Sequence, residues 1–193
     1  HCSLRPYQKT GLDWLWFLYQ NRIGGVLADD MGLGKTIQAM ALLLNANPSR
    51  PSLVVCPTSV LDHWVEKAQL FAPALRTMKY YGPKRKDLLK VAGGARIVLT
   101  TYAILASDPE LAQIEWDVAI LDEAQRIKNT ATHCHRAARK LKARMRLALT
   151  GTPIENFIDE LKAIMDFAVP GYLRESDLGD VARRVRQQVP EPL

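Results

Sequence analysis

The sequence has no long apolar run, and this absence argues against a membrane-spanning chain. A spanning helix needs about 18 consecutive apolar residues, and no stretch here approaches that length. The 3 cysteines are too few and too scattered for a disulfide framework, and no two have CxxC spacing. No basic and then apolar leader follows His1, and a start without Met suggests a fragment or processed chain. We therefore expect no membrane partner and an intracellular location, in the cytoplasm or nucleoid of a bacterium or the nucleus of a eukaryote.

What the chain does contain is the composition of a folded domain. Of its 193 residues, 48% are hydrophobic and 24% are charged, which argues against disorder and for one compact domain with room for a tail. The 26 lysines and arginines outnumber the 20 aspartates and glutamates and give a net charge of +6. A positive balance of this size permits a nucleic-acid partner without demonstrating one.

Short apolar runs alternate with longer segments of helical pattern along most of the chain. The predicted strands are Ile23–Ala28, Leu53–Cys56, Thr77–Tyr81, Ile97–Thr101, Val118–Leu121 and Arg146–Leu149. The predicted helices are Pro6–Gln20, Thr36–Asn45, Ser59–Leu70, Lys84–Ala92, Thr132–Lys142 and Asp159–Phe167. This alternation predicts an α/β fold with a doubly wound, mostly parallel sheet flanked by helices. Ligands of such sheets bind at the carboxyl ends of the strands.

The two ends of the chain carry weaker signals. The aromatic residues of the opening helix, which are Trp14, Trp16, Phe17 and Tyr19, are expected to pack against the domain. The domain is expected to span residues 1–173. The charged segment 174–193 that follows is interpreted as a solvated helix or a tail.

The strongest local signal is the run Asp29–Thr36, which reads Asp-Asp-Met-Gly-Leu-Gly-Lys-Thr between the first strand and the next helix. Its glycines let the backbone curl so that successive N–H groups point at one anion, and the helix start adds partial positive charge. Lys35 can then reach the β- and γ-phosphates of a nucleotide, and the Thr36 hydroxyl can bind Mg²⁺. The usual GxxxxGK[ST] pattern has glycine in place of Asp29, so the strict pattern fails. The strand–loop–helix setting still favours nucleotide binding over a turn that binds nothing.

A pair of carboxylates at the end of another strand supplies the second half of the predicted site. The apolar run Val118–Leu121 leads directly into Asp122 and Glu123. One carboxylate there can hold Mg²⁺, and the next can orient and deprotonate an attacking water. The pair is a weak signal alone, but together with the phosphate loop it predicts hydrolysis of a nucleoside triphosphate.

These runs resemble, in unbroken order over residues 4–173, the motifs of the Swi/Snf type of helicase-like ATPases in helicase superfamily two. Leu4–Gln8 resembles the entry motif, and Asp29–Thr36 resembles motif I, which in this family lacks the first glycine. The other matching runs are Leu53–Val60 with Trp64, Ile97–Tyr102, Asp122–Asn129, Leu149–Asn156 with Asp159–Leu161, and Pro170–Leu173. The tails of the runs that begin at Asp122 and Leu149 are specific to this family.

The resemblance implies the first of two RecA-like lobes of a double-stranded DNA translocase that remodels protein–DNA complexes. ATP and Mg²⁺ would bind between the lobes, DNA would lie across both, and the second lobe, absent from this chain, would bring an arginine finger. This lobe alone is therefore expected to be nearly inactive. The implied catalytic residues are Lys35, Thr36, Asp122 and Glu123, with Thr36 and Asp122 on the metal. The implied cofactor-binding residues are Gln8, on adenine, and Met31, Gly32, Leu33, Gly34, Lys35 and Thr36.

Coupling and DNA contact fall on the remaining loops. The implied coupling residues are Gln125, Thr150, Gly151 and Thr152, although plain turn chemistry explains a Gly-Thr-Pro sequence equally well. The implied DNA contacts are Pro57, Thr58, Ser59, Thr100, Thr101 and Tyr102, whose hydroxyls and helix-start amides suit phosphate oxygens. Such binding would be salt-dependent and nearly blind to sequence.

Three other functions compete with a translocase. A strand-separating DNA or RNA helicase would share the fold, but its relatives carry Asp-Glu-Ala-Asp or Asp-Glu-x-His where this chain has Gln125. A non-catalytic interaction module would not need Lys35, Asp122 and Glu123 together. A small-molecule kinase has no reason to carry the run at Leu149–Asn156.

Several other features are given structural interpretations. His133, Cys134 and His135 are adjacent and share no helical face, so they predict a surface or helix-start segment rather than a metal site. Cys56 is predicted to be buried, and Lys84–Lys86 to be a solvated basic run. Residues 126–146 hold eight basic residues and no acidic one. A solvated helix is the favoured account of that segment, and a DNA-facing surface is the alternative.

Overall fold

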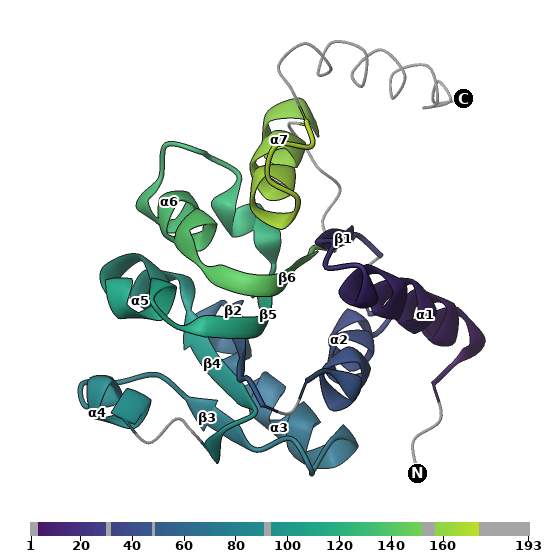
Figure 1. Cartoon of the computed structure of the whole chain (residues 1–193), viewed down its shortest axis with the longest axis horizontal. Coiled ribbons are helices and arrows are strands. Elements are labelled where there is room, and N and C mark those ends of the chain that lie inside the picture. Colours follow the sequence, from purple (N-terminus) through teal and green to yellow (C-terminus); the bar gives the residue numbers. More distant parts are fainter. Residues whose placement is uncertain (1–3, 30–31, 48, 91–93, 152–156, 174–193) are drawn as a thin grey trace.

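The computed structural model of the chain describes residues 4–29, 32–47, 49–90, 94–151 and 157–173. Among them lies a 6-stranded sheet with the order β1-β6-β5-β2-β4-β3, in which every neighbouring pair is parallel. The strands are β1 (Gly25–Leu27), β2 (Ser52–Cys56), β3 (Thr77–Lys79), β4 (Ile97–Thr101), β5 (Glu115–Asp122) and β6 (Lys142–Leu149). The predicted α/β fold with a parallel sheet is confirmed (Figure 1).

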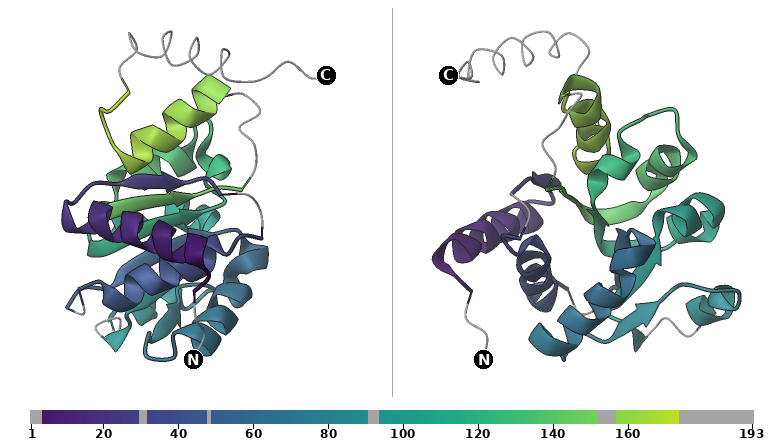
Figure 2. Two further views of the ribbon diagram at one scale, coloured as in Figure 1. Left: turned by 90° about the vertical axis from the view of Figure 1, so that its right-hand side faces the viewer. Right: turned by 180° about the vertical axis from the view of Figure 1, so that it is seen from behind.

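Helices cover both faces of the sheet, as Figure 2 shows. One face carries α1 (Pro6–Gln20), α2 (Lys35–Asn45) and α3 (Leu61–Phe71), the last preceded by the 3₁₀ turn η1 (Thr58–Val60). The other carries α5 (Tyr102–Ser107), α6 (His133–Lys140), α7 (Phe157–Ala168) and the 3₁₀ turns η3 (Pro109–Ala112) and η4 (Ala124–Ile127). The short α4 (Arg85–Lys90) is linked to this second group by ion pairs from Arg85 to Asp108 and from Lys86 to Glu110. In the described part of the chain, no helix is long and apolar enough to cross a bilayer.

Strand β2 shows why the sheet needs two helical layers. All five of its residues are buried, because a parallel strand in the middle of such a sheet has no solvent face. Val54 and Cys56 belong to the core beneath α1 to α3, and Leu53 and Val55 to the core beneath α5 to α7. Cys56 is fully buried, which confirms its predicted packing role. This burial raises the pKa of its thiol to about 12.

The structure differs from the predicted elements in three places. Helix α6 ends at Lys140, and the strand that follows already begins at Lys142. The start of this strand was hidden in the sequence because it alternates basic residues with Ala143 and Met145. The predicted strand 77–81 stops at Lys79, and Gly82, at φ 87°, turns the chain three residues later. Helix α5 was not predicted at all.

The aromatic residues of α1 divide between the core and the surface. Tyr19 is buried, and Trp16 stacks on it with ring centroids 5.2 Å apart. Trp14 and Phe17 are 41% and 57% exposed, so the expectation that they pack inside the domain was wrong for these two. A helix that lies on the surface buries only one stripe of side chains, and these two lie outside that stripe.

Candidate active site

The loop between β1 and α2 forms a curled backbone at the carboxyl end of the sheet. Gly32 and Gly34 have φ values of 85° and 81°, a left-handed conformation that glycine adopts without steric cost. Gly34 is the N-cap of α2, so the first free N–H groups of that helix open into the loop. The Lys35 ammonium donates to the Asp29 carbonyl oxygen at 2.6 Å, which holds the side chain over the loop. Met31 lies outside the described residues.

Gln8 joins this loop to the start of α1. Its side-chain amide donates to the Leu33 carbonyl oxygen at 3.2 Å and accepts from the Arg5 backbone N–H at 3.0 Å. The Gln8 side chain is 7% exposed. A Cβ atom on Gly34 would lie 2.5 Å from the Gln8 amide nitrogen, so only glycine permits this approach.

A cavity of about 640 Å³ opens beside Gln8 and the glycine loop. Its lining combines apolar side chains from α1, α2 and α3 with the loop backbone, and it includes Leu4, Tyr7, Leu12, Ile37, Met40, Ala41, Leu44 and Phe71. Arg5, Gln8 and Asn45 add polar groups to this lining. A cavity that combines apolar walls with polar groups is the usual form of a small-molecule pocket, and this one adjoins the predicted phosphate loop.

Asp122, at the end of β5, lies close to the Lys35 side chain. Its carboxylate accepts from the Trp64 indole N–H at 2.7 Å and from the Glu123 backbone N–H at 3.0 Å. The Tyr102 hydroxyl donates to the Asp122 carbonyl oxygen at 2.7 Å. Burial raises the pKa of Asp122, while the Trp64 hydrogen bond and the positive charge of Lys35 act in the opposite direction. The residues predicted from two separate motifs are thus brought together.

Glu123 is linked to the end of β6 through Gln125. The Gln125 amide donates to the Glu123 carboxylate at 2.6 Å, and the Thr150 hydroxyl donates to the Gln125 amide oxygen at 3.1 Å. Thr150 is 2% exposed, so its hydroxyl has no access to bulk water as an alternative partner. Gly151 follows it at the same edge, and Thr152 lies outside the described residues.

The backbone of Glu123 is unusual for a residue with a side chain. Its φ and ψ are 54° and 53°, in the left-handed region. Such a conformation is uncommon outside glycine, asparagine and aspartate, and it carries steric strain. The strand β5 ends at Asp122, and the left-handed turn at Glu123 follows at once, so the two carboxylates have different hydrogen-bond partners.

Comparison with known proteins agrees with this geometry. The SNF2-related domain matches residues 7–182 of the chain. The chain belongs to the SNF2-related family. YwqA of Bacillus subtilis is 47% identical over 179 residues, a match that covers 89% of this chain and 19% of that protein. The ATP-dependent helicase FUN30 of Saccharomyces cerevisiae is 39% identical, with 87% of this chain and 16% of that protein covered.

A solved structure supports the same assignment. The SWI2/SNF2 ATPase core of Sulfolobus solfataricus in complex with double-stranded DNA has a TM-score of 0.85 and 43% sequence identity. The match covers 98% of this chain and 41% of that one. This SNF2-related chain therefore spans less than half of the ATPase core it resembles, and less than a fifth of the curated relatives above. The resemblance inferred from the sequence motifs is confirmed.

Two of the residues predicted to contact DNA in this SNF2-related chain are exposed to solvent. Thr58 and Ser59 form the exposed turn η1 directly after β2, and Pro57 beside them is half-buried. Their exposure leaves hydroxyl and backbone groups accessible at the carboxyl edge of the sheet. The DNA contact itself stays a prediction.

The side chains of the other three predicted contacts are buried and hydrogen-bonded within the fold, and their contact with DNA stays a prediction. The hydroxyl of Thr100, which is 0% exposed, donates to the Tyr80 carbonyl oxygen at 3.0 Å. Thr101 is the N-cap of α5, and its side chain accepts from a backbone N–H of that helix. The Tyr102 hydroxyl donates to the Asp122 carbonyl oxygen. Each of these buried hydroxyls has a hydrogen-bond partner within the fold, as is usual for buried polar groups.

The residues of this SNF2-related chain that were given structural interpretations, at 133–135 and 84–86, also have partners in the fold. His135 is buried, with Nε2 at 3.3 Å from the Ala163 carbonyl oxygen, and burial lowers its pKa. All three residues lie in the first turn of α6, so the expected helix-start position is confirmed, although His135 is buried and not on the surface. In the described residues, no group of three or more His, Cys, Asp or Glu side chains forms a metal site. The predicted solvated run at 84–86 is interrupted by Arg85, which pairs with buried Asp108 at 2.8 Å.

Trp64 is the site residue whose role sequence reasoning missed. Its position after the motif at Leu53–Val60 drew attention to it, but no pattern indicates that its indole reaches a carboxylate 58 residues away. Tyr102 was assigned to DNA instead of to the backbone of the acidic motif. In both cases the partner depends on how α3 and α5 pack against the carboxyl edge of the sheet.

Proposed function

We propose that this chain is the ATP-binding lobe of an ATP-dependent double-stranded DNA translocase of the Swi/Snf type. The observation that carries the proposal is the hydrogen-bonded bridge from Glu123 through Gln125 to Thr150, at the edge of the sheet where the loop that carries Lys35 also lies. A site for binding alone needs the phosphate loop. It does not need a second carboxylate that is tied to the end of another strand.

The residues present fit a Mg²⁺–ATP complex. The curled backbone from Gly32 to Thr36 offers N–H groups to phosphate oxygens, and the cavity of about 640 Å³ beside Gln8 has room for the base. Thr36 and Asp122 would hold the metal, which when bound offsets the negative charge that develops on the phosphate oxygens. The Lys35 ammonium would neutralise charge on the β- and γ-phosphates, and Gln8 would hydrogen-bond the adenine edge.

Glu123 is the base in this proposal, and Gln125 controls it. The Glu123 carboxylate would accept the proton of the attacking water. One of its oxygens accepts from the Gln125 amide at 2.6 Å. Gln125 in turn accepts from Thr150 at 3.1 Å. A shift of the loop after β6 would therefore change how freely Glu123 can turn toward a water, and this links motion of Thr150, Gly151 and Thr152 to hydrolysis.

The second lobe of the parent protein completes the proposed motor. It would supply the arginine finger and the other half of the DNA track, and the exposed Pro57–Ser59 turn would contact the phosphates of the duplex. We expect this chain alone to bind ATP weakly and to hydrolyse it hardly at all. Duplex-stimulated turnover by the isolated chain would contradict that expectation.

The test compares two threonine variants in the full-length protein. Thr150→Val removes the hydroxyl that supports Gln125, and Thr100→Val removes an equally buried hydroxyl that serves only the fold. A neutral hydrogen bond contributes about 1 kcal/mol, so we expect Thr150→Val to lower duplex-stimulated ATP turnover by about fivefold while ATP affinity is unchanged. Thr100→Val should leave both unchanged.

Three outcomes would contradict the proposal. Equal effects of Thr150→Val and Thr100→Val would remove the coupling role of Thr150. Efficient strand displacement by the full-length protein would favour a helicase over a translocase. An absence of ATP turnover in the presence and absence of DNA, with nucleotide still bound, would favour the non-catalytic module.

A further inference from the structure

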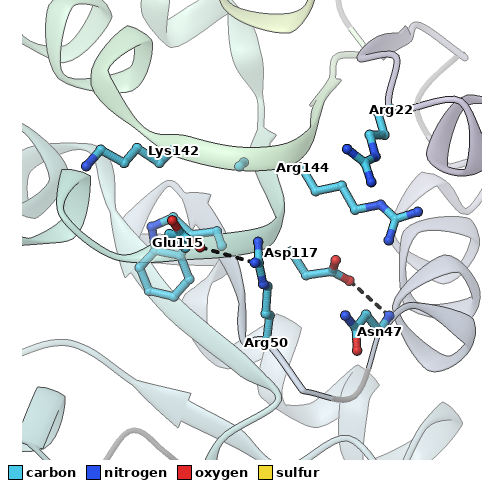
Figure 3. Close-up of a pocket in the computed structure, with 9 residues that line it drawn as sticks. Arg22, Asn47, Arg50, Glu115, Asp117, Lys142 and Arg144 are labelled. Carbon is cyan, nitrogen blue, oxygen red and sulfur yellow. Dashed lines mark hydrogen bonds and ion pairs between the residues drawn. The ribbon is translucent and has the colours of Figure 1, made fainter.

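A second cavity lies at the opposite edge of the sheet from the nucleotide loops. It has a volume of about 630 Å³ and is bounded by the first residues of β5 and β6, the connection between α2 and β2, and the turn after α1 (Figure 3). Strand β5 runs from Glu115 in this cavity to Asp122 in the candidate active site. At about 3.3 Å per residue, the two sites are roughly 23 Å apart. The cavity, which we call the amino-edge hollow, is therefore separate from the ATP site.

Basic side chains dominate the amino-edge hollow. Its four cationic residues are Arg22, Arg50, Lys142 and Arg144, and its two acidic residues are Glu115 and Asp117. Asp117 is 0% exposed, and its carboxylate accepts from the Tyr19 hydroxyl at 2.9 Å and from the Asn47 backbone N–H at 3.0 Å. These bonds direct its charge inward. The rim therefore has an excess of positive charge.

Two guanidinium groups of the hollow have no carboxylate partner among the described residues. Arg144 lies over the Tyr19 ring, 4.5 Å from its centroid, and its Nε–H is buried without a hydrogen-bond partner in that part of the chain. Arg22 enters from the turn after α1, where its φ is 57°. Figure 3 shows the two guanidinium groups on the same side of the cavity. Like charges held together in this way favour a bound oxyanion, and the planar fork of arginine matches a carboxylate.

The single ion pair of the hollow that the described residues form is exposed. Arg50 and Glu115 are 3.2 Å apart, with side chains 49% and 69% exposed. Exposed pairs of this kind are weak, so a carboxylate from another molecule can replace Glu115 on Arg50 at little cost. Arg50 already pairs with a carboxylate, so the group that best replaces Glu115 on it is another carboxylate.

We propose that the amino-edge hollow is a docking site for an acidic peptide segment of a partner protein. Carboxylates of the segment would contact Arg22 and Arg144, and a further one would compete with Glu115 for Arg50. Recognition of acidic motifs by clustered arginines is a recurring binding mode. The position of the hollow leaves the ATP site and the Pro57–Ser59 turn free while a partner is bound.

The probe is a short fluorescein-labelled polyglutamate peptide, and the readout is its fluorescence anisotropy with the full-length protein. Saturating duplex DNA is present, so that the DNA track cannot take the peptide. Arg22→Glu should weaken peptide binding by about tenfold, because it reverses a charge that faces the ligand. Glu115→Gln should strengthen binding by roughly threefold, because it removes a competing carboxylate. A damaged fold would not produce two changes of opposite sign.

The matched control is Lys84→Glu, which makes the same change in net charge at an exposed residue ahead of α4. It should change the affinity for the peptide by less than about twofold. Equal weakening by Lys84→Glu and Arg22→Glu would reduce the effect to net charge and overturn the proposal. Failure of the peptide to bind beside saturating duplex would overturn it as well. Duplex affinity that falls with Arg22→Glu and not with Lys84→Glu would assign the hollow to DNA phosphates instead.

Discussion

The hydrogen bond between Trp64 and Asp122 leads to a prediction about stability that depends on pH. Trp64→Phe keeps most of the buried ring and removes the indole N–H, which donates to Asp122 at 2.7 Å. A hydrogen bond to a charged group contributes about 1.5–3 kcal/mol. The smaller ring costs about 1–2 kcal/mol more through lost apolar contact. The total at neutral pH is therefore about 3–5 kcal/mol.

The sign of the pH dependence follows from the pKa of Asp122. Burial already raises that pKa above its usual value, so ionisation of Asp122 opposes folding as the pH rises. Trp64 reduces this cost, because its N–H stabilises the ionised form. The variant should consequently lose about 3–5 kcal/mol at about pH 8 and less at about pH 4, where the raised pKa leaves more of the carboxyl group protonated and the hydrogen bond to its charged form contributes less.

Urea denaturation of the chain at the two pH values measures the difference, and Trp116→Phe is its matched control. Trp116 is as deeply buried as Trp64, but its indole donates at 2.9 Å to the neutral Leu111 carbonyl oxygen. Its substitution should cost the same at both pH values. A loss for Trp64→Phe that does not change with pH would refute the reasoning, because the interaction with the Asp122 carboxylate would then be worth no more than one with a neutral acceptor.

Two further predictions concern the glycine loop between β1 and α2 and the ion pair between Arg85 and Asp108. Gly34→Ala should weaken binding of an ATP analogue to the chain more than Gly32→Ala does, because its Cβ would lie 2.5 Å from the Gln8 amide and displace it, whereas a Cβ on Gly32 has nothing within 4 Å. Gly32→Ala should weaken binding by no more than about tenfold through backbone strain, and isothermal titration distinguishes the two variants. Asp108→Asn should lower the Tm by roughly 5 °C at neutral pH, since the Arg85 hydrogen bond holds the pKa of Asp108 well below its usual range. The deficit should shrink as the pH falls through about 4, where that carboxylate loses its charge in the unfolded chain first. A deficit that is constant across pH would contradict it.

The general arrangement of this SNF2-related lobe was accessible from its sequence, because parallel strands buried on both faces are short, apolar and regularly spaced. The loops that hold Lys35 and Asp122 follow such strands, so their meeting at one edge could be inferred from topology alone. The helix α1 was predicted with the bounds that the structure shows. Helix α6 was not, because a basic strand that starts two residues after a basic helix has no change in composition to mark it.

What the sequence did not reveal are contacts that depend on the path of the chain in space. Thr100 and Thr101 have hydroxyls typical of a binding loop, and the structure uses one to bond the Tyr80 carbonyl and the other to cap α5. Trp64 and Asp122 are joined only because α3, which packs against β4 and β3, brings the Trp64 indole to the carboxyl end of β5. The amino-edge hollow had no motif at all, since its charges come from four separate segments of the chain.

Because of the left-handed backbone at Glu123, selection for stability and selection for ATP turnover should favour different residues at this position. Glycine is the residue that adopts this conformation without steric cost, so a library screened only for resistance to heat or protease would be expected to enrich Glu123→Gly. The same substitution removes the carboxylate that faces Gln125. A library screened for ATP turnover should retain glutamate and its strain. Stabilising this lobe for engineering therefore calls for changes elsewhere, such as at the exposed Trp14 and Phe17 of α1.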